Sequence, residues 1–198
     1  MASVIRRLSI LVALAVAAAA PAAAHAASCP TVPVAQTFSP WLDPAWYEYA
    51  PNGGFESGAT GWTVTGAAAT VAGNESFYVH SAADHRSLAL PAGATATSPT
   101  VCIGVEHPTV RFFALNTGAS TSRLAVSVVF HGLDGKLTSL GVGQVAAGAA
   151  WAPTPVVPVL VNLLSLLGDQ QVAFRFAPAD SLGNWRIDDV YIDPYGKR

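Results

Sequence analysis

Short β-type segments separated by turn signals run through most of this chain, and their spacing is what most constrains its fold. Six segments are rich in β-branched and aromatic residues, and region 62–71 adds one or two more strands; the six are 76–81, 109–116, 123–131, 137–145, 171–177 and 185–193. Asp134-Gly135, which lies between two of them, is a strong β-hairpin signal. The pattern predicts an all-β fold in which two antiparallel sheets form a β-sandwich.

Apolar residues alternate along several of these segments, which assigns one face of each to the core. In 123–131, for example, Leu124 and Val126 share a face, while Ala125 and Ser127 share the other. The same argument extends to the other segments. The predicted core contains Phe77, Val79, Val110, Phe112, Ala114, Leu124, Val126, Val128, Phe130, Val172, Phe174 and Phe176.

The last segment breaks this alternation. Trp185 and Ile187 have one parity, whereas Val190 and Ile192 have the other. A regular strand cannot bury both pairs on the same side, but one extra residue at Asp188-Asp189 would bring them into phase. The sequence therefore predicts a β-bulge that holds two adjacent carboxylates in unusual geometry.

The first 26 residues have the anatomy of a secretory signal peptide. Arg6 and Arg7 precede an apolar stretch, and Ala24-His25-Ala26 supplies a cleavage site. The alternative is a retained membrane anchor, but the stretch is short and consists mostly of weakly hydrophobic alanine. We expect residues 27–198 to be exported to the cell envelope or the extracellular space, with no further membrane span.

The charge balance argues against a nucleic-acid partner. The chain has 10 basic and 12 acidic residues, and removal of 1–26 would take away two of the basic ones. A sparsely charged, mildly acidic surface without a Lys/Arg cluster does not suit a phosphate backbone. Scarce lysine with abundant alanine and glycine is typical of a GC-rich bacterial genome.

The two cysteines, Cys29 and Cys102, are predicted to form a disulfide, because an even cysteine count in an exported chain favours pairing. Closing so long a loop is worth roughly 4 kcal/mol in the chain-entropy model. The alternative is lipidation of Cys29, since Ala26-Ala27-Ser28-Cys29 is similar to a bacterial lipoprotein signal. That signal normally has a large aliphatic residue where this chain has Ala26.

Two regions fit a plain sandwich less well. Residues 27–51 form an arm rich in proline and aromatic residues, which we expect to pack across one sheet because exposed aromatic rings forfeit about 1.5–3 kcal/mol each. Residues 151–158 contain three prolines, which exclude a central strand. The apolar run 159–167 fits a buried strand or a short helix, and we expect a short packed helix or an irregular insert.

Motifs at the two ends of the mature chain carry a resemblance to a known family. Asn52-Gly53-Gly54-Phe55-Glu56 with Gly61-Trp62, and the final Trp185-Arg186-Ile187-Asp188-Asp189-Val190-Tyr191-Ile192, resemble the first and last strands of galactose-binding-like jelly rolls. The resemblance is strongest to carbohydrate-binding modules of families 4, 9 and 22. It implies a jelly-roll domain over 52–198 and a structural calcium ion held by Glu56 and by Asp188 or Asp189.

The candidate ligand surface lies on the strand faces opposite the predicted core. Aromatic faces flanked by hydrogen-bond donors suit sugar rings. The alternative is that the arm covers the aromatic residues and that the arginines pair with carboxylates. The candidate ligand-binding residues are Tyr78, His80, Arg111, Phe113, His131 and Arg175.

No catalytic motif is evident. The histidines lack the paired spacing of a zinc site, and no nucleophile elbow or phosphate loop is present. Glu75, Asp84 and Glu106 could approach one another as acids for glycoside hydrolysis, which leaves a secreted hydrolase or lyase as a remote alternative. The sequence favours a secreted, non-catalytic module that binds carbohydrate. A structural or adhesive surface protein acting through 159–167 is the main alternative.

Overall fold

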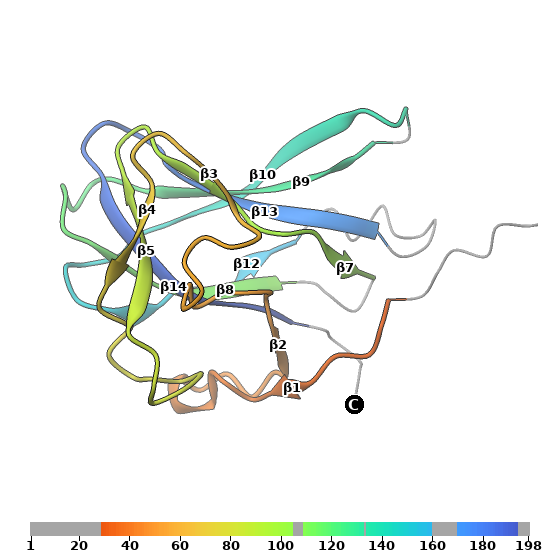
Figure 1. Ribbon diagram of the computed structural model, residues 1–198, viewed down its shortest axis with the longest axis horizontal. Helices are drawn as coiled ribbons and strands as arrows, with labels where there is room; N and C mark the ends of the chain where they lie inside the picture. Colours follow the sequence, from red (N-terminus) through yellow and green to blue (C-terminus); the bar gives the residue numbers. More distant parts are fainter. Residues whose placement is uncertain (1–28, 105–108, 133, 160–169, 194–198) are drawn as a thin grey trace, which may run out of the picture.

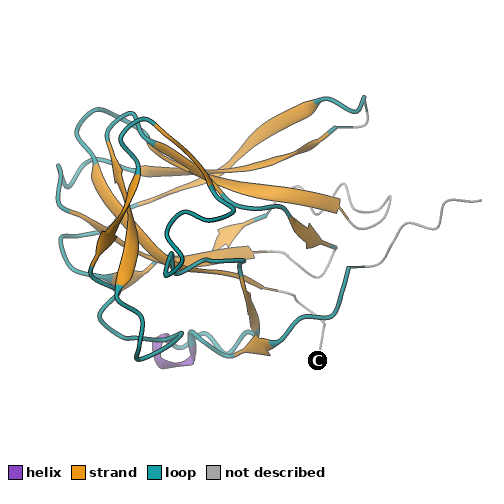
Figure 2. Cartoon of the chain, viewed as in Figure 1, coloured by secondary structure: helices purple, strands orange, loops and turns teal. Residues whose placement is uncertain are grey.

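Two antiparallel sheets face each other in the computed structural model, which describes residues 29–104, 109–132, 134–159 and 170–193 (Figures 1 and 2). The predicted all-β sandwich is therefore confirmed. The single helix of the described residues is the 3-10 turn η1 (Ser39–Trp41). None of the described helices is long and apolar enough to cross a membrane. The predicted signal peptide, 1–26, lies outside the described residues.

The larger sheet has eight strands, and β14 (Asn184–Asp193) lies at its centre. One side of β14 pairs with β8 (Thr109–Asn116), which in turn pairs with the short β11 (Ala152–Pro153) and β12 (Val157–Pro158). Its other partners are β5 (Arg86–Pro91), followed by β4 (Ala69–Ala72), and β2 (Tyr47–Tyr49), followed by β1 (Val34–Ala35). The proline-rich pieces thus lie at the sheet's edge, where a missing N–H is tolerated.

The smaller sheet has six strands. Its order is β10 (Leu137–Val145), β9 (Leu124–His131), β13 (Gln170–Pro178), β6 (Thr95–Thr97) and β3 (Thr63–Thr65), with β7 (Val101–Ile103) also beside β13. The expected hairpin at Asp134-Gly135 joins β9 to β10, and the two strands project from the body of the sandwich (Figure 1).

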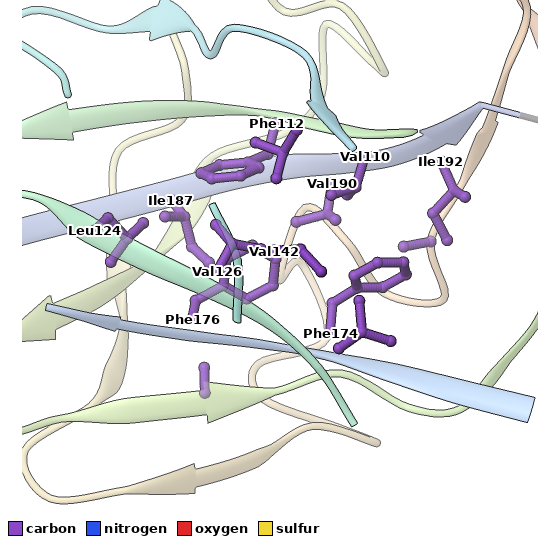
Figure 3. Packing of buried hydrophobic residues seen from close by; sticks show 14 of the residues in the cluster. Val110, Phe112, Leu124, Val126, Val142, Phe174, Phe176, Ile187, Val190 and Ile192 are labelled. Atoms are coloured by element: carbon purple, nitrogen blue, oxygen red, sulfur yellow. The ribbon is translucent and has the colours of Figure 1, made fainter. Parts of the chain in front are cut away.

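The main core fills the space between the sheets (Figure 3). Of the twelve predicted core residues, the ten on β8, β9 and β13 are buried in this cluster. The prediction for Phe77 and Val79 was wrong, because Phe77 is 45% exposed and Val79 is only partly buried, outside the main core. Region 76–81 is not a strand, since the Glu75 carboxylate accepts the backbone N–H groups of Phe77 and Val79 and curls the chain into a loop.

Several strands that the sequence pattern did not reveal lie between residues 86 and 103. β5, β6 and β7 are short, and β6 is made only of threonine and alanine. Such segments lack the run of large β-branched residues that marks a strand in a sequence. The Ser98 hydroxyl, which bonds to the N–H of Phe174, helps to hold this region against β13.

The predicted β-bulge in β14 is confirmed. Asp188 lies opposite Phe113 and Tyr191 lies opposite Arg111, so Asp189 and Val190 together face a single residue of β8. Asp189 takes the extra position with a φ of 45°, a left-handed conformation that aspartate tolerates better than most residues. Trp185, Ile187, Val190 and Ile192 consequently all enter the same core.

The motif Asn52-Gly53-Gly54-Phe55-Glu56 lies directly against this bulge. Ala50 donates its N–H to the carbonyl of Val190 at 2.9 Å, and Val190 donates its N–H to the carbonyl of Gly53 at 3.3 Å. A Cβ on Gly53 would stand 2.9 Å from the Val190 carbonyl oxygen, so only glycine fits this approach. The two motifs that resemble the ends of a jelly roll are therefore neighbours in space.

The arm packs on the outer face of the larger sheet and forms a second, smaller core. Phe38 and Tyr47 of the arm are buried against Phe113 and Tyr191 of the sheet. The predicted disulfide between Cys29 and Cys102 is present and ties the start of the arm to β7. Of the apolar run 159–167, Val159 is buried in the main core, and the remainder lies outside the described residues.

Candidate functional site

The bulge places two carboxylates inside the protein. Asp188 and Asp189 are both fully buried. The Asp188 oxygens accept the N–H groups of Asp189 at 2.9 Å and Glu75 at 2.8 Å. Asp189 accepts a hydrogen bond at 3.2 Å from the Tyr49 hydroxyl through Oδ1, whereas its Oδ2 is buried without a hydrogen-bond partner.

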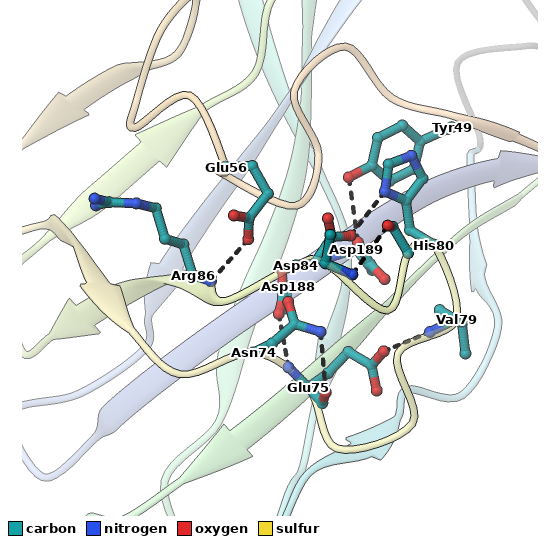
Figure 4. Close-up of polar contacts among 12 residues, drawn as sticks. Tyr49, Glu56, Asn74, Glu75, Val79, His80, Asp84, Arg86, Asp188 and Asp189 are labelled. Atoms are coloured by element: carbon teal, nitrogen blue, oxygen red, sulfur yellow. Dashed lines mark hydrogen bonds and ion pairs between the residues drawn. The ribbon is translucent and has the colours of Figure 1, made fainter.

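Loop 74–85 brings further polar groups over this bulge. His80 Nδ1 lies 2.8 Å from Asp84 Oδ2, and the His80 ring stacks on Tyr49 with a centroid distance of 4.0 Å and an interplanar angle of 6°. Figure 4 shows the two rings over one another, with Asp84 and Asp189 beside them. We call Tyr49, Glu75, His80, Asp84, Asp188 and Asp189 the bulge cluster.

The sequence of loop 74–85 explains its shape. Glu75 is fully buried and caps the backbone N–H groups of Phe77 and Val79, while the N–H of Glu75 itself is bound by Asp188. Tyr78 takes a φ of 54°, which reverses the chain within this turn. The loop is thus anchored to β14 through buried acidic groups, and Val79 adds apolar packing against the smaller core.

Ionising the acids of the bulge cluster together is electrostatically unfavourable. Burial raises the pKa of Asp188 to about 9, and the neighbouring Asp189 charge adds to this rise. Burial also raises the pKa of Asp189 to about 7, with the charge of Glu75 as the next cause; His80 acts in the opposite direction. Two aspartates whose pKa values are raised by burial indicate a site that lacks compensating positive charge.

Of the residues predicted to hold calcium, Glu56 and Asp188 fit that ion poorly, because their oxygens already accept N–H groups. Glu56 Oε1 accepts the N–H groups of His85 and Arg86 at 2.8 and 2.7 Å, and its Oε2 pairs with the His85 ring at 2.9 Å. Asp188 is likewise occupied by two N–H donors. Calcium needs six to eight oxygen ligands directed at one centre, and carboxylates already turned toward N–H donors do not supply them.

A surface of aromatic side chains adjoins the bulge cluster. Trp41 of η1 and Phe77 of loop 74–85 meet edge to face with centroids 4.9 Å apart, and both rings rest on Phe113. Phe77 is 45% exposed and the next residue, Tyr78, is 51% exposed. We call Trp41, Phe77 and Tyr78 the aromatic platform.

The structure separates the six predicted ligand residues into four places. Arg111 and Phe113 lie beneath the arm, where Arg111 pairs with Asp43 and Phe113 stacks on Phe38 at 5.5 Å. Both are buried, so neither contributes to an open ligand surface. The alternative interpretation, that the arm covers this face and the arginine pairs with a carboxylate, describes these two residues.

The other four predicted ligand residues do not converge either. Tyr78 and His80 lie in loop 74–85, beside the larger sheet. His131 lies at the exposed end of β9 in the smaller sheet. Arg175 lies in the middle of β13, half-buried, with its Nε donating to the Thr97 hydroxyl. Of these four residues, only Tyr78 and His80 therefore lie in one neighbourhood.

Sequence reasoning missed several members of this neighbourhood. Tyr49 and Trp41 were assigned to packing of the arm, and Phe77 was assigned to the core. Glu75 and Asp84 were considered only as hydrolytic acids, together with Glu106, which lies outside the described residues. One available signal was the four-residue spacing from His80 to Asp84.

No family model and no curated protein matches this chain. Solved structures do match. The CBM22-1–GH10 modules of endo-1,4-β-D-xylanase 10B from Clostridium thermocellum, complexed with xylohexaose, align with a TM-score of 0.52 and 13% identity over 72% of this chain and 28% of that chain. The enzymatically active domain of tailspike protein 4 from bacteriophage CBA120 aligns with a TM-score of 0.50 and 18% identity. That alignment covers 73% of this chain and 21% of the tailspike chain.

These similarities concern the fold. This chain spans about a quarter of the length of the two solved chains. At such low sequence identity, the similarity is one of fold alone. The protein therefore has the jelly-roll β-sandwich fold found in carbohydrate-binding modules, in agreement with the resemblance carried by its terminal motifs.

Proposed function

We propose that this protein is an exported, non-catalytic module that binds carbohydrate, and that the aromatic platform is its contact surface. The observation that carries the proposal is the exposure of Phe77 and Tyr78, at 45% and 51%, on a loop held in place by buried polar groups. Exposed aromatic side chains that are rigidly supported are unusual on a protein surface that has no partner.

The chemistry of the platform suits a sugar. Aromatic faces stack against the C–H groups of a pyranose ring, and nearby polar groups bond to its hydroxyls. His80, whose side chain is 41% exposed, supplies such a group two residues after Tyr78. Phe113 supports Phe77 and Trp41 from below, so the rings are ordered before a ligand arrives. Pre-ordering lowers the entropic cost of binding.

The fold supports the same class of ligand. The xylanase structure that shares the jelly-roll architecture is complexed with xylohexaose. A xylan-type polysaccharide is therefore the first probe, alongside mannan, cellulose and bacterial exopolysaccharides. The disulfide between Cys29 and Cys102 supports the proposed action outside the cytoplasm.

Affinity electrophoresis in gels that contain each polysaccharide, followed by calorimetry with oligosaccharides, tests the proposal. Tyr78→Ala and Phe77→Ala should each weaken binding by about three- to tenfold, since stacking on one ring is worth about 0.5–1.5 kcal/mol. Leu137→Ala is the matched control, because Leu137 is 66% exposed on the distant β10. Retardation that survives both platform variants, or no retardation by any polysaccharide, would refute the assignment.

The second candidate is an adhesive or structural role. β10 is an edge strand of the smaller sheet, and it carries the exposed apolar residues Leu137 and Leu140, which are 66% and 41% exposed. An exposed edge with apolar side chains favours pairing with another chain. Concentration-dependent association in sedimentation experiments, lost in Leu140→Lys, would favour this role over carbohydrate binding.

A further inference from the structure

Three side chains in the bulge cluster each present a metal-ligand atom to the same small volume. The ligand atoms of His80, Asp84 and Asp189 all lie within 4.8 Å of one another. They come from two segments far apart in the sequence, loop 74–85 and the bulge of β14 (Figure 4). In the described part of the chain this is the one group of at least three His, Cys, Asp or Glu side chains with that geometry.

An unsatisfied atom provides a second, independent observation. Asp189 is fully buried, and its Oδ2 has no hydrogen-bond partner. A buried carboxylate oxygen without a donor has lost its hydrogen bonds to water and gained none in return. Native proteins therefore normally provide such an atom with a partner. The other Asp189 oxygen is held by the Tyr49 hydroxyl, which fixes the orientation of the carboxylate.

The local charge points in the same direction. Asp84, Asp188, Asp189 and Glu75 are all buried, and within the described residues no lysine or arginine forms an ion pair with any of them. His80 is the one ionisable group of positive sign in the cluster. A divalent cation would balance this concentration of negative charge where no side chain does.

We propose that His80, Asp84 and Asp189 bind one divalent transition-metal ion of the zinc type. One imidazole nitrogen with two carboxylates is a donor set that suits zinc, cobalt or manganese, whereas calcium and magnesium prefer oxygen ligands alone. Three protein ligands leave room for a water molecule, the arrangement of an open site. This proposal goes beyond carbohydrate binding and does not depend on it.

The surroundings of the three ligands are organised as a metal site requires. The Tyr49 ring stacks on His80 and restricts its rotation, while the Tyr49 hydroxyl orients Asp189. The His80 side chain is 41% exposed, which gives an ion a route to the two buried carboxylates. A bound ion would tie loop 74–85 to β14, so it would stabilise the folded protein by mass action.

Titration of the EDTA-treated, disulfide-intact protein with Co²⁺ and Zn²⁺ tests the proposal directly. Co²⁺ should produce visible d–d absorption that saturates at one equivalent, and Zn²⁺ should abolish that absorption. Zn²⁺ at 100-fold its Kd should also raise Tm by about 5–10 °C. Neither readout involves a glycan, so failure here is separate from failure of carbohydrate binding.

Matched variants locate the ion. His80→Ala and Asp189→Asn should each abolish the Co²⁺ absorption, whereas His85→Ala, which removes a side chain 69% exposed on the same loop, should leave it unchanged. Circular dichroism of each metal-free variant confirms that it is folded. Absence of saturable absorption in the wild-type protein, or absorption that persists in His80→Ala, overturns the proposal. A Tm rise with Ca²⁺ but not Zn²⁺, lost in Glu56→Ala, overturns it in favour of a calcium site.

Discussion

Two regions on the outer face of the larger sheet bury charged side chains, and they do so in opposite ways. Beneath the arm, Arg111 pairs with Asp43, donates through Nε to the Thr154 carbonyl at 3.0 Å and lies 4.2 Å from the centroid of the Phe38 ring. Every charge there has a partner. In the bulge cluster, Asp188 and Asp189 are buried without an equivalent cation.

The pKa values express this difference. Burial raises the pKa of Asp43, but hydrogen bonds from Tyr47, the Ala45 N–H and Arg111 outweigh it, and the net pKa is lowered. In the bulge cluster nothing outweighs burial, and both aspartate pKa values are raised. The buried charges beneath the arm are thus neutralised by one another. The buried carboxylates of the bulge cluster need a bound proton or cation to be neutralised.

The largest loss of stability should follow from breaking the Arg111–Asp43 ion pair beneath the arm. Arg111→Met keeps the length and apolar contacts of the side chain but removes the cation paired with Asp43 and the donor to the Thr154 carbonyl. We expect the free energy of unfolding to fall by about 3 kcal/mol in urea denaturation at pH 7, because one half of a largely buried pair remains uncompensated.

The matched control for this variant is Lys136→Met. Lys136 pairs with Asp134 on the surface at 3.5 Å, with side chains 83% and 59% exposed. Such a pair is screened by water, so its loss should not change stability measurably. Equal losses of unfolding free energy in the two variants would show that the buried Arg111 pair stabilises the protein no more than the exposed Lys136 pair does.

The second effect is a dependence on pH that has opposite signs in the two regions. The raised pKa values of Asp188 and Asp189, about 9 and about 7, mean that the folded protein holds protons that the unfolded chain releases near pH 4. Stability from this source is therefore full below pH 4 and is lost as pH rises through 7 and 9. Asp43, whose pKa is lowered, contributes stability above pH 4 that is lost as the solution becomes more acidic.

Urea denaturation in EDTA should show the unfolding free energy falling by about 2 kcal/mol between pH 6 and pH 7. Asp189→Asn should make this slope shallower, since asparagine does not titrate, while Asp188 remains to titrate. A metal-free wild-type protein whose stability rises over this range would contradict the electrostatic description of the bulge cluster.

The smallest effect tests the packing that shapes the bulge cluster. A Cβ on Gly54 would collide with the Tyr49 hydroxyl and stand 2.8 Å from Asp189 Oδ1. Gly54→Ala should cost about 1 kcal/mol, because Tyr49 must turn away and give up its hydrogen bond. The control is Gly141→Ala on β10, where no atom lies within 4 Å of the new Cβ. A stable Gly54→Ala protein with wild-type stacking of Tyr49 on His80 would remove the steric argument.

Much of the sandwich follows from the sequence because its signals are local. Residues 109–116 and 137–145 were predicted with the bounds that β8 and β10 have, since alternation and the Asp-Gly turn depend only on near neighbours. The bulge was predicted for the same reason: the change of parity between Ile187 and Val190 admits one simple geometry. The jelly-roll fold and the disulfide were also predicted correctly.

The candidate sites depended on contacts that sequence patterns do not encode. Alternation identifies which residues point away from the main core, but it does not say whether solvent or another segment meets them. Phe113 points outward and is buried all the same, because Phe38 of the arm covers it. Phe77 fits a strand pattern, yet the buried Glu75 carboxylate curls its segment into a loop.

The sequence by itself determined the long strands β8, β9, β10, β13 and β14, the bulge in β14 and the motif that lies against it, because each rests on periodicity or turn chemistry within a few residues. Tertiary structure alone decided that His80 and Asp84 would join Asp189, and that Trp41 would join Phe77. These pairs come from segments far apart in the chain. Their proximity is set by how the arm and loop 74–85 pack on the sheet, not by the residues beside them in the sequence.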